Sequence, residues 1–547
     1  MIKRYSGALF KLTVPALLSL LFVSAAPALR VKPPEKAATP VLAAQAAPAA
    51  GPLRFHVALS SGVSSQPLSG RLIVFMSDAK QQREMLDAGF IPGSVWVAAM
   101  EVEAIRPGET IYFDPDVKAY PAPFSKAKAG SYQFMALLDT DHSYAYSNQM
   151  DGNSYYGPVT RVAPVDPSNT APIELTIGNR HAAQTLPDNP SIKLVEFQSP
   201  MLSRFWGRPI YIQAGVVLPP SYNTSPDRRY PTAYLIHGFG GDHTGAWRQG
   251  PSLINQMTAG RIPEFVYVFL NGHLPTGHHE FADSVNNGPW GAALTEEFIP
   301  YLEKEYRLVA HPYARFLTGH SSGGWSTLWL QVTYPDFFGG TWSTSPDPVD
   351  LRSFTGIDAS PGSTDNAYIN KDGSAKNLVR MDGKDVATTE QFARQEDVLG
   401  EYGGQFASFE WVWSPKGPGG RPMKMFNRET GQLNQDVLQA WTKYDIRRIL
   451  DEHWSVLGPK LKGKINLVCG TADTFHLNEP LAILCDFFKQ KGSDAVCEMV
   501  PGRTHMDLYR PYDTYPDGLQ VRIFNQMQAK FENAGGAGAK KAAHASK

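Results

Sequence analysis

From Ser191 onward, short apolar runs alternate along the chain with segments whose apolar residues recur at helical spacing. Strands that alternate with helices typically form a mostly parallel sheet with helices on both faces. We therefore expect residues 191–533 to form a doubly wound α/β domain. Pro300 lies inside the predicted helix 292–306, where we expect a kink, and residues 350–462 interrupt the alternation as an insertion. The predicted strands are 191–197, 209–218, 232–237, 265–270, 315–318, 340–344, 464–469 and 495–500, and the other predicted helices are 251–259, 323–333 and 478–491.

The segment Gly319-His320-Ser321-Ser322-Gly323 follows one of these strands and precedes a helix. A sharp strand-to-helix turn needs small residues beside the nucleophile, because its backbone is strained and closely approached. Such a turn lifts the Ser321 hydroxyl clear of the sheet, and the N-terminus of the next helix favours a developing oxyanion. The alternative is a glycine-rich packing turn, but the strand–turn–helix context favours a nucleophilic serine.

A serine hydroxyl is a poor nucleophile unless a base accepts its proton. In this kind of fold the partners follow in the order serine, acid, histidine. Asp473 and His505 each come just after a predicted strand, at the sheet edge where ligands collect. We therefore predict Ser321, Asp473 and His505 as a catalytic triad. Asp347, after an earlier strand, is a rival acid, and His476 is a rival histidine.

An oxyanion hole in such a site pairs the N–H after the nucleophile with an N–H from an earlier loop. The first is that of Ser322. The glycine-rich segment 235–241 supplies the second, because its backbone can approach a substrate closely. We favour the amide of Phe239 or Gly240, and the alternative is an ordinary turn between a strand and a helix.

Eight segments carry a further pattern: Trp206–Pro209, Gly215–Tyr222, Tyr230–Pro231, Leu235–Gly241, Glu297–Leu302, Gly319–Gly323, Gly470–Asp473 and Pro501–His505. Together they resemble the Putative esterase family of α/β-hydrolases, which includes esterase D, feruloyl esterases, the antigen 85 mycolyltransferases and enterochelin esterases. The resemblance covers roughly 200–345 and 460–530 and implies an α/β-hydrolase fold with serine esterase activity and no cofactor. The insertion 350–462 is longer than the family pattern.

Residues 53–185 have a different pattern, with short alternating runs between glycine- and proline-containing turns. Many short strands of this kind favour a β-sandwich, which we expect to be immunoglobulin-like. The region lacks the Cys…Trp…Cys pattern of the disulfide-pinned versions. A β-rich domain ahead of a hydrolase domain looks most like the enterochelin esterase arrangement. No nucleophile–base pair with usable context occurs in this region, so we expect it to be non-catalytic.

The chain begins with features of a secretory signal peptide, predicted over residues 1–28. A positively charged start precedes a largely apolar run at 12–23 and small residues at 26–28. A membrane anchor is the alternative, but the run is short of the ~20 residues that span a bilayer. We therefore expect a secreted or periplasmic protein. The Ala- and Pro-rich residues 29–52 are predicted to be a flexible linker and 534–547 a disordered tail.

The charges are balanced, with 51 Lys and Arg against 52 Asp and Glu, so nothing indicates binding to nucleic acid or anionic lipid. Three cysteines exclude a disulfide-stapled scaffold, although Cys485 and Cys497 leave a disulfide or two free thiols open. His278-His279-Glu280 with His273 suggests a metal site only weakly, because polar loops often carry such residues. We expect no metal.

Aromatic residues are candidates for contact with substrate. Trp247 and Trp290 follow strand ends and are predicted to line a cleft, with core packing as the alternative. The insertion carries Phe406, Phe409, Trp411 and Trp413, of which the last three alternate and would put aromatics on one face. Core packing is equally compatible with that alternation.

These observations predict an exported serine esterase that forms an acyl-enzyme, with aromatic or carbohydrate-linked esters preferred to long-chain lipids. An acyltransferase and a serine peptidase of the same fold are alternatives. A non-catalytic carbohydrate- or surface-binding protein is a third, and the intact set of triad residues argues against it. The sequence leaves the natural ester and the oligomeric state open.

Overall fold

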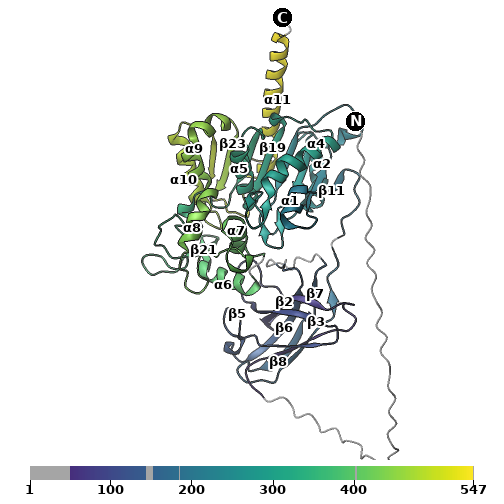
Figure 1. Ribbon diagram of the computed structural model, residues 1–547, viewed down its shortest axis with the longest axis vertical. Helices are drawn as coiled ribbons and strands as arrows, with labels where there is room; N and C mark the ends of the chain where they lie inside the picture. Colours follow the sequence, from purple (N-terminus) through teal and green to yellow (C-terminus); the bar gives the residue numbers. More distant parts are fainter. Residues whose placement is uncertain (1–49, 143, 145–151, 184, 401–402, 546–547) are drawn as a thin grey trace, which may run out of the picture. The chain divides into compact units, whose positions relative to one another are not determined.

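The computed structural model describes residues 50–142, 144, 152–183, 185–400 and 403–545. The predicted signal peptide and nearly all of the predicted linker therefore lie outside the described residues. An eight-stranded sheet occupies the C-terminal part (Figure 1), in the order β11-β12-β14-β13-β19-β20-β23-β24. The first two pairings are antiparallel and all the others are parallel. The strands are β11 (Ile192–Gln198), β12 (Tyr211–Val217), β13 (Thr232–Ile236), β14 (Val266–Leu270), β19 (Arg315–His320), β20 (Gly340–Thr344), β23 (Ile465–Gly470) and β24 (Val496–Val500).

Helices cover both faces of this sheet. Successive strand residues point to opposite sides, so apolar residues of one strand pack against helices on both faces. Phe316 of β19 packs with α2 and α11, whereas Leu317, the next residue, packs with α4 and α5. In the same way, Val468 of β23 packs with α11, whereas Leu467, the residue before it, packs with α9 and α10. The mostly parallel α/β sheet is thus confirmed. The helices are α1 (Pro200–Trp206), α2 (Gly245–Thr258), α4 (Ile299–Glu305), α5 (Ser322–Thr333), α9 (Ile446–Leu461), α10 (Asn478–Gln490) and α11 (Leu519–Ala545).

Two helices differ from the sequence expectation. A π-helical segment, Ala293–Phe298, joins α3 (Trp290–Ala292) to α4, so Pro300 stands in the first turn of α4, where its missing N–H is tolerated. The helix α11 continues to Ala545 through the tail that we expected to be disordered. That stretch is rich in alanine, the residue with the highest helix propensity.

The chain between β20 and β23 leaves the sheet and returns through α9. It contains a hairpin of β21 (Asn377–Met381) and β22 (Lys384–Thr388), followed by α6 (Thr389–Leu399), α7 (Gln405–Trp413) and α8 (Gln435–Trp441). The last helix, α9, packs on α5 and is the crossover helix to β23, so the insertion ends earlier than the predicted 462. Phe409 and Trp413 are one turn apart on α7 and stack at 4.8 Å, so the strand-like alternation of aromatics was misleading.

The N-terminal region consists of two sheets that share one apolar core. One sheet has the order β4-β1-β9 and the other β10-β7-β6-β2-β3-β5, with β8 beside β6. Phe55, Val57 and Leu59 alternate inward from β1 and meet Leu72 and Val74 of β2. The strands are β1 (Phe55–Leu59), β2 (Leu68–Asp78), β3 (Trp96–Ile105), β4 (Thr110–Phe113), β5 (Ala119–Tyr120), β6 (Gly130–Asp139), β7 (Ser154–Tyr156), β8 (Thr160–Val165), β9 (Ile173–Ile177) and β10 (Asn179–Arg180).

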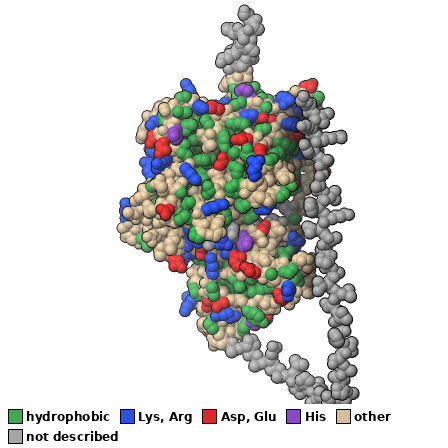
Figure 2. All heavy atoms as spheres, in the orientation of Figure 1, with side chains coloured by type: hydrophobic (Ala, Val, Ile, Leu, Met, Phe, Trp, Pro, Cys, Tyr) green, Lys and Arg blue, Asp and Glu red, His purple; other side chains and the backbone are tan. Residues whose placement is uncertain are grey.

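The surface carries positive and negative side chains intermixed on the face shown in Figure 2. Among the described residues, no helix is both long and apolar enough to cross a bilayer.

Candidate active site

Ser321 stands at the sharp turn between β19 and α5. Its backbone has φ 59° and ψ −124°, a conformation that L-residues rarely adopt. Two glycines make the turn possible. A Cβ on Gly319 would lie 2.3 Å from Gly323 O, and a Cβ on Gly323 would lie 2.0 Å from Ile236 O on the neighbouring strand. Any side chain at either position would force the turn apart, which explains the glycine on each side of this strained residue.

Asp473 and His505 come together at the same edge of the sheet. Asp473 follows β23 and His505 follows β24, and these strands are parallel neighbours. The His505 Nδ1–H donates a hydrogen bond to Asp473 Oδ2 at 2.9 Å. Burial by itself would raise the pKa of Asp473, but the charge and hydrogen bond of His505 lower it to about 2. Asp473 therefore remains ionised and orients the imidazole.

The rival acid, Asp347, occupies a different position. Its Oδ2 accepts a hydrogen bond from the Ser322 hydroxyl at 2.6 Å, and its N–H donates to Ser321 O at 3.3 Å. Burial and the nearby buried carboxyl of Glu280 raise the pKa of Asp347 to about 7. Asp347 thus holds the Ser321 turn through these two hydrogen bonds, whereas Asp473 is the carboxylate bonded to His505. The rival histidine, His476, instead faces Glu479, with Nδ1 3.3 Å from Oε1.

The glycine-rich loop after β13 lies directly against the turn. A Cβ on Gly238 would be 3.2 Å from Ser321 Cβ and 3.8 Å from its Oγ, so only a residue without a side chain lets the loop approach this closely. Gly240 has a φ of 77°, which favours glycine. Phe239 lies between them and lines the same cavity as Ser321. Ser322 is the first residue of α5, so its amide belongs to the helix N-terminus.

Ser321 and His505 both line a cavity of about 360 Å³ with mostly apolar walls. Several segments contribute, and α7 supplies Phe406 and Phe409, two of the four aromatic candidates of the insertion. Trp411 and Trp413 of α7 are buried and are not among the lining residues. The other lining residues are Phe90, Gly238, Phe239, His320, Asp347, Pro348, Thr355, Leu378, Phe392, Gln405, Phe475, Leu477, Met506 and Tyr509.

Neither tryptophan predicted to contact substrate lines this cavity. Trp290 is buried and stacks on His279 at 3.9 Å between ring centroids, and its indole N–H donates to Asn287 O. The Trp247 indole N–H donates to Pro187 O at 3.0 Å. The prediction that these two tryptophans line the cleft was wrong. The Trp290 ring packs on His279, and both indole N–H groups donate to backbone carbonyls outside the cavity.

Two of the three histidines weighed as metal ligands, His278 and His279, have side chains that bond to the backbone. His278 Nε2–H donates to His237 O and His279 Nε2–H donates to Asn271 O, each at 3.1 Å. The other nitrogen of each ring accepts an N–H two residues along the chain. Burial lowers the pKa of His278 to about 3, so the ring is neutral and holds the loop after β14.

His320 links the serine turn to the histidine loop. Burial lowers its pKa to about 3, so the ring is neutral. Its Nε2–H donates to His505 O at 3.1 Å, and its Nδ1 lies 3.0 Å from Thr344 Oγ1, the hydroxyl that donates to Gly319 O at 2.9 Å. The Tyr509 hydroxyl in turn lies 2.9 Å from Thr344 Oγ1.

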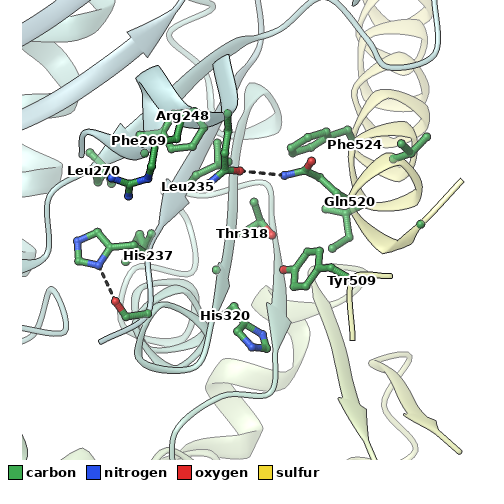
Figure 3. A pocket seen from close by; sticks show the side chains of 18 of the residues that line it. Leu235, His237, Arg248, Phe269, Leu270, Thr318, His320, Tyr509, Gln520 and Phe524 are labelled. Atoms are coloured by element: carbon green, nitrogen blue, oxygen red, sulfur yellow. Dashed lines mark hydrogen bonds between the residues drawn. The ribbon is translucent and has the colours of Figure 1, made fainter. Parts of the chain in front are cut away.

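A second cavity, of about 560 Å³, lies on the sheet face covered by α2 and α11. His237 and His320 are among the residues that line it (Figure 3), and the Gln520 side-chain amide of α11 donates to Gln249 of α2 at 3.4 Å. His320 and Tyr509 line both cavities, so this hydrogen-bonded group forms part of the wall between them.

Sequence reasoning missed three phenylalanines of the first cavity. They are Phe90 from the β2–β3 connection, Phe392 from α6 and Phe475 from the loop after Asp473. Phe475 was detectable, since it lies two residues beyond the predicted acid. Nothing in the sequence indicates that Phe90, 231 residues before Ser321, reaches this site.

An eight-stranded sheet of this order, with a serine at a strained strand–helix turn after β19 and an aspartate and a histidine after β23 and β24, is the arrangement of an α/β-hydrolase. Residues 207–431 match the family model described as Putative esterase. The likeness to that family covers this region, which is less than half of the 547-residue chain. The match ends before Asp473 and His505, so only the tertiary structure connects those residues with the serine turn.

Known proteins similar to the chain carry esterase names. Esterase Rv1288 of Mycobacterium tuberculosis is 30% identical over 143 residues, which are 26% of this chain and 30% of that protein. An endo-1,4-beta-xylanase/feruloyl esterase of Xylanibacter ruminicola is 28% identical over 23% of this chain and 18% of its own length. The chain thus matches less than a third of either relative. A solved ferulic acid esterase aligns with 61% of this chain and 100% of its own, at 16% identity and a TM-score of 0.39.

Proposed function

We propose that the protein is an exported serine esterase whose catalytic triad is Ser321, His505 and Asp473. The observation that carries the proposal is the 2.9 Å hydrogen bond from His505 Nδ1 to Asp473, beside a cavity that Ser321 and His505 both line. Because Nδ1 is engaged by Asp473, Nε2 is the nitrogen that takes the serine proton.

The reaction has two halves. Ser321 Oγ attacks the ester carbonyl carbon while His505 accepts its proton, and the alcohol leaves with that proton as the acyl-enzyme forms. Water then gives a proton to His505, attacks the acyl carbon and releases the carboxylic acid, and Ser321 regains its hydrogen. Asp473 stabilises the imidazolium in both halves. We assign the oxyanion hole to the amides of Ser322 and of Phe239 or Gly240, supported by the close approach of Gly238 to Ser321.

The substrate that we propose is a carboxylic ester with an aromatic acyl group. Six phenylalanines line the cavity: Phe90, Phe239, Phe392, Phe406, Phe409 and Phe475. Aromatic walls favour flat rings through edge and stacking contacts. A volume of about 360 Å³ lies near the lower end of the range of typical small-molecule pockets, which suits one substituted ring better than a long alkyl chain.

Covalent labelling tests the proposal. A fluorophosphonate probe should label the wild-type protein at Ser321, identified by peptide mass spectrometry, and should leave Ser321→Ala unlabelled. The same variant should lose hydrolysis of methyl ferulate while keeping the wild-type circular dichroism spectrum. Labelling of another residue, or turnover by Ser321→Ala, would refute the assignment of Ser321 as the nucleophile.

We also propose that residues 53–185 form an immunoglobulin-like sandwich domain and residues 191–533 the hydrolase domain. The shared core between the two N-terminal sheets supports the first. Limited proteolysis should then cut the connection between them before it cuts either unit. Export through a signal peptide predicts a mature N-terminus near residue 29, which mass spectrometry of protein recovered from the periplasm or medium measures.

A further inference from the structure

Phe90 belongs to the N-terminal β-sheet region, yet it lines the cavity that contains Ser321. It lies in the connection between β2 and β3 and contacts aromatic rings from three other parts of the chain. Its ring centroid is 5.2 Å from that of Phe392, 5.8 Å from Phe475 and 6.0 Å from Phe239. Phe475 in turn meets the His505 imidazole edge-on at 5.0 Å. Phe90 therefore stands one ring away from the proposed base.

The segment that carries Phe90 is held from its own domain. Leu86 and Ala88 are buried in the same apolar cluster as Ile73 and Phe75 of β2. The Ala88 N–H donates to the Tyr144 hydroxyl at 3.2 Å. Gly89 has a φ of 69°, which lets the chain turn immediately before Phe90. These contacts set the position of Phe90 from the β-sheet side.

The helix α6 of the insertion holds the same segment from the other side. The Gln395 side-chain amide donates to Gly89 O at 2.9 Å, next to Phe90. Arg71 of β2 donates to Val398 O at 2.8 Å, and Lys118 forms an ion pair with Asp397 at 3.3 Å. Three polar contacts thus join the β-sheet region to the helix that also carries Phe392. Because its segment is held from both sides, the Phe90 ring is preorganised as part of the cavity wall.

We propose that Phe90 is a specificity-determining residue: the N-terminal β-sheet region supplies one wall of the acyl pocket and thereby sets a preference for aromatic over small aliphatic acyl groups. The proposal rests on the esterase function proposed above. Its physical basis is that an aromatic acyl group gains edge or stacking contact with Phe90, whereas an acetyl group is too short to reach beyond Ser321 and the oxyanion loop. The β-sheet region then contributes to substrate choice without contributing to the chemical step.

The test compares two esters that differ only in the acyl group, methyl cinnamate and methyl acetate, on full-length protein. Phe90→Ala should lower the ratio of their kcat/KM values by about 10-fold or more. Phe90→Leu should lose less, because it keeps part of the apolar contact. The matched control is Tyr112→Ala, an exposed aromatic residue of the same region, which should leave the ratio unchanged.

A fluorophosphonate probe separates this inference from the proposed function. If wild-type Ser321 is not labelled, the esterase proposal itself fails. If Ser321 is labelled at the wild-type rate in Phe90→Ala and the cinnamate-to-acetate ratio is unchanged, the role of Phe90 is refuted and the esterase proposal stands. An equal loss on both esters with slower labelling would show that Phe90 only supports the fold, which also overturns the inference.

Discussion

His320 Nε2 donates a hydrogen bond to the backbone carbonyl of His505 at 3.1 Å, so the residue before the candidate nucleophile holds the loop of the candidate base. The two imidazole rings lie 4.3 Å apart between centroids. A direct bond of this kind couples the positions of the serine turn and of the histidine loop, although 185 residues separate them in the chain.

His320→Ala should lower kcat by about 10- to 100-fold with little change in KM, because a displacement of the base near 1 Å has effects of that size. Steady-state kinetics on an aromatic methyl ester measure both parameters. Tyr509→Phe is the comparison variant, since it removes only the far hydroxyl of the hydrogen-bonded group. It should cost much less than His320→Ala, and equal losses would contradict a positioning role for His320.

Asp473→Asn should lower kcat by about 10⁴, the usual cost when the triad acid no longer holds the base in its working tautomer. Asp347→Asn should lower it by less than about 10-fold, because the Asn side-chain oxygen still accepts the Ser322 hydroxyl. Single-turnover kinetics of acylation in both variants test this directly. A larger loss in Asp347→Asn than in Asp473→Asn would show that the acid was assigned to the wrong strand.

Asp347 should make the protein less stable as the pH rises from about 4 to about 7. Burial raises its folded-state pKa from 3.8 to about 7, so in this window the unfolded carboxyl loses its proton while the folded one retains it. Asp347→Asn should gain stability relative to wild type across the same window, by up to about 4 kcal/mol. Urea unfolding at pH 4, 6 and 8 measures the difference. A pH-independent difference would contradict the prediction.

The disulfide between Cys485 of α10 and Cys497 of β24 joins the two elements that separate Asp473 from His505. Loop-closure entropy for a separation of 12 residues predicts that its removal costs about 3 kcal/mol. Reductant should therefore lower the Tm of the wild type. It should leave the Tm of the double variant Cys485→Ser/Cys497→Ser unchanged, because the remaining cysteine, Cys469, is buried and forms no disulfide. An unchanged wild-type Tm under reductant would contradict the prediction.

Local patterns were sufficient to predict the α/β sheet and to select Ser321, His505 and two candidate acids. Strands such as β14 and β23 are largely apolar runs because both of their faces are buried, and that property is visible without a structure. The glycines on either side of Ser321 also indicate the sharp turn from the sequence alone, because the turn has no room for a side chain at those positions. Asp473 and His505 were found because they follow strands, and parallel strands place their carboxyl ends along one edge.

Long-range packing decided the rest. The choice between Asp473 and Asp347 depends on which carboxylate reaches His505, and both follow strands of the same sheet. The alternation of Phe409, Trp411 and Trp413 left substrate contact and core packing equally open, and the structure places all three in the helix α7 with their side chains buried. The walls of the cavity are assembled from the β2–β3 connection, α6, α7 and the loop after β23. No periodicity within one segment encodes such an assembly, because a residue like Phe90 acquires its neighbours only when distant parts of the chain pack together.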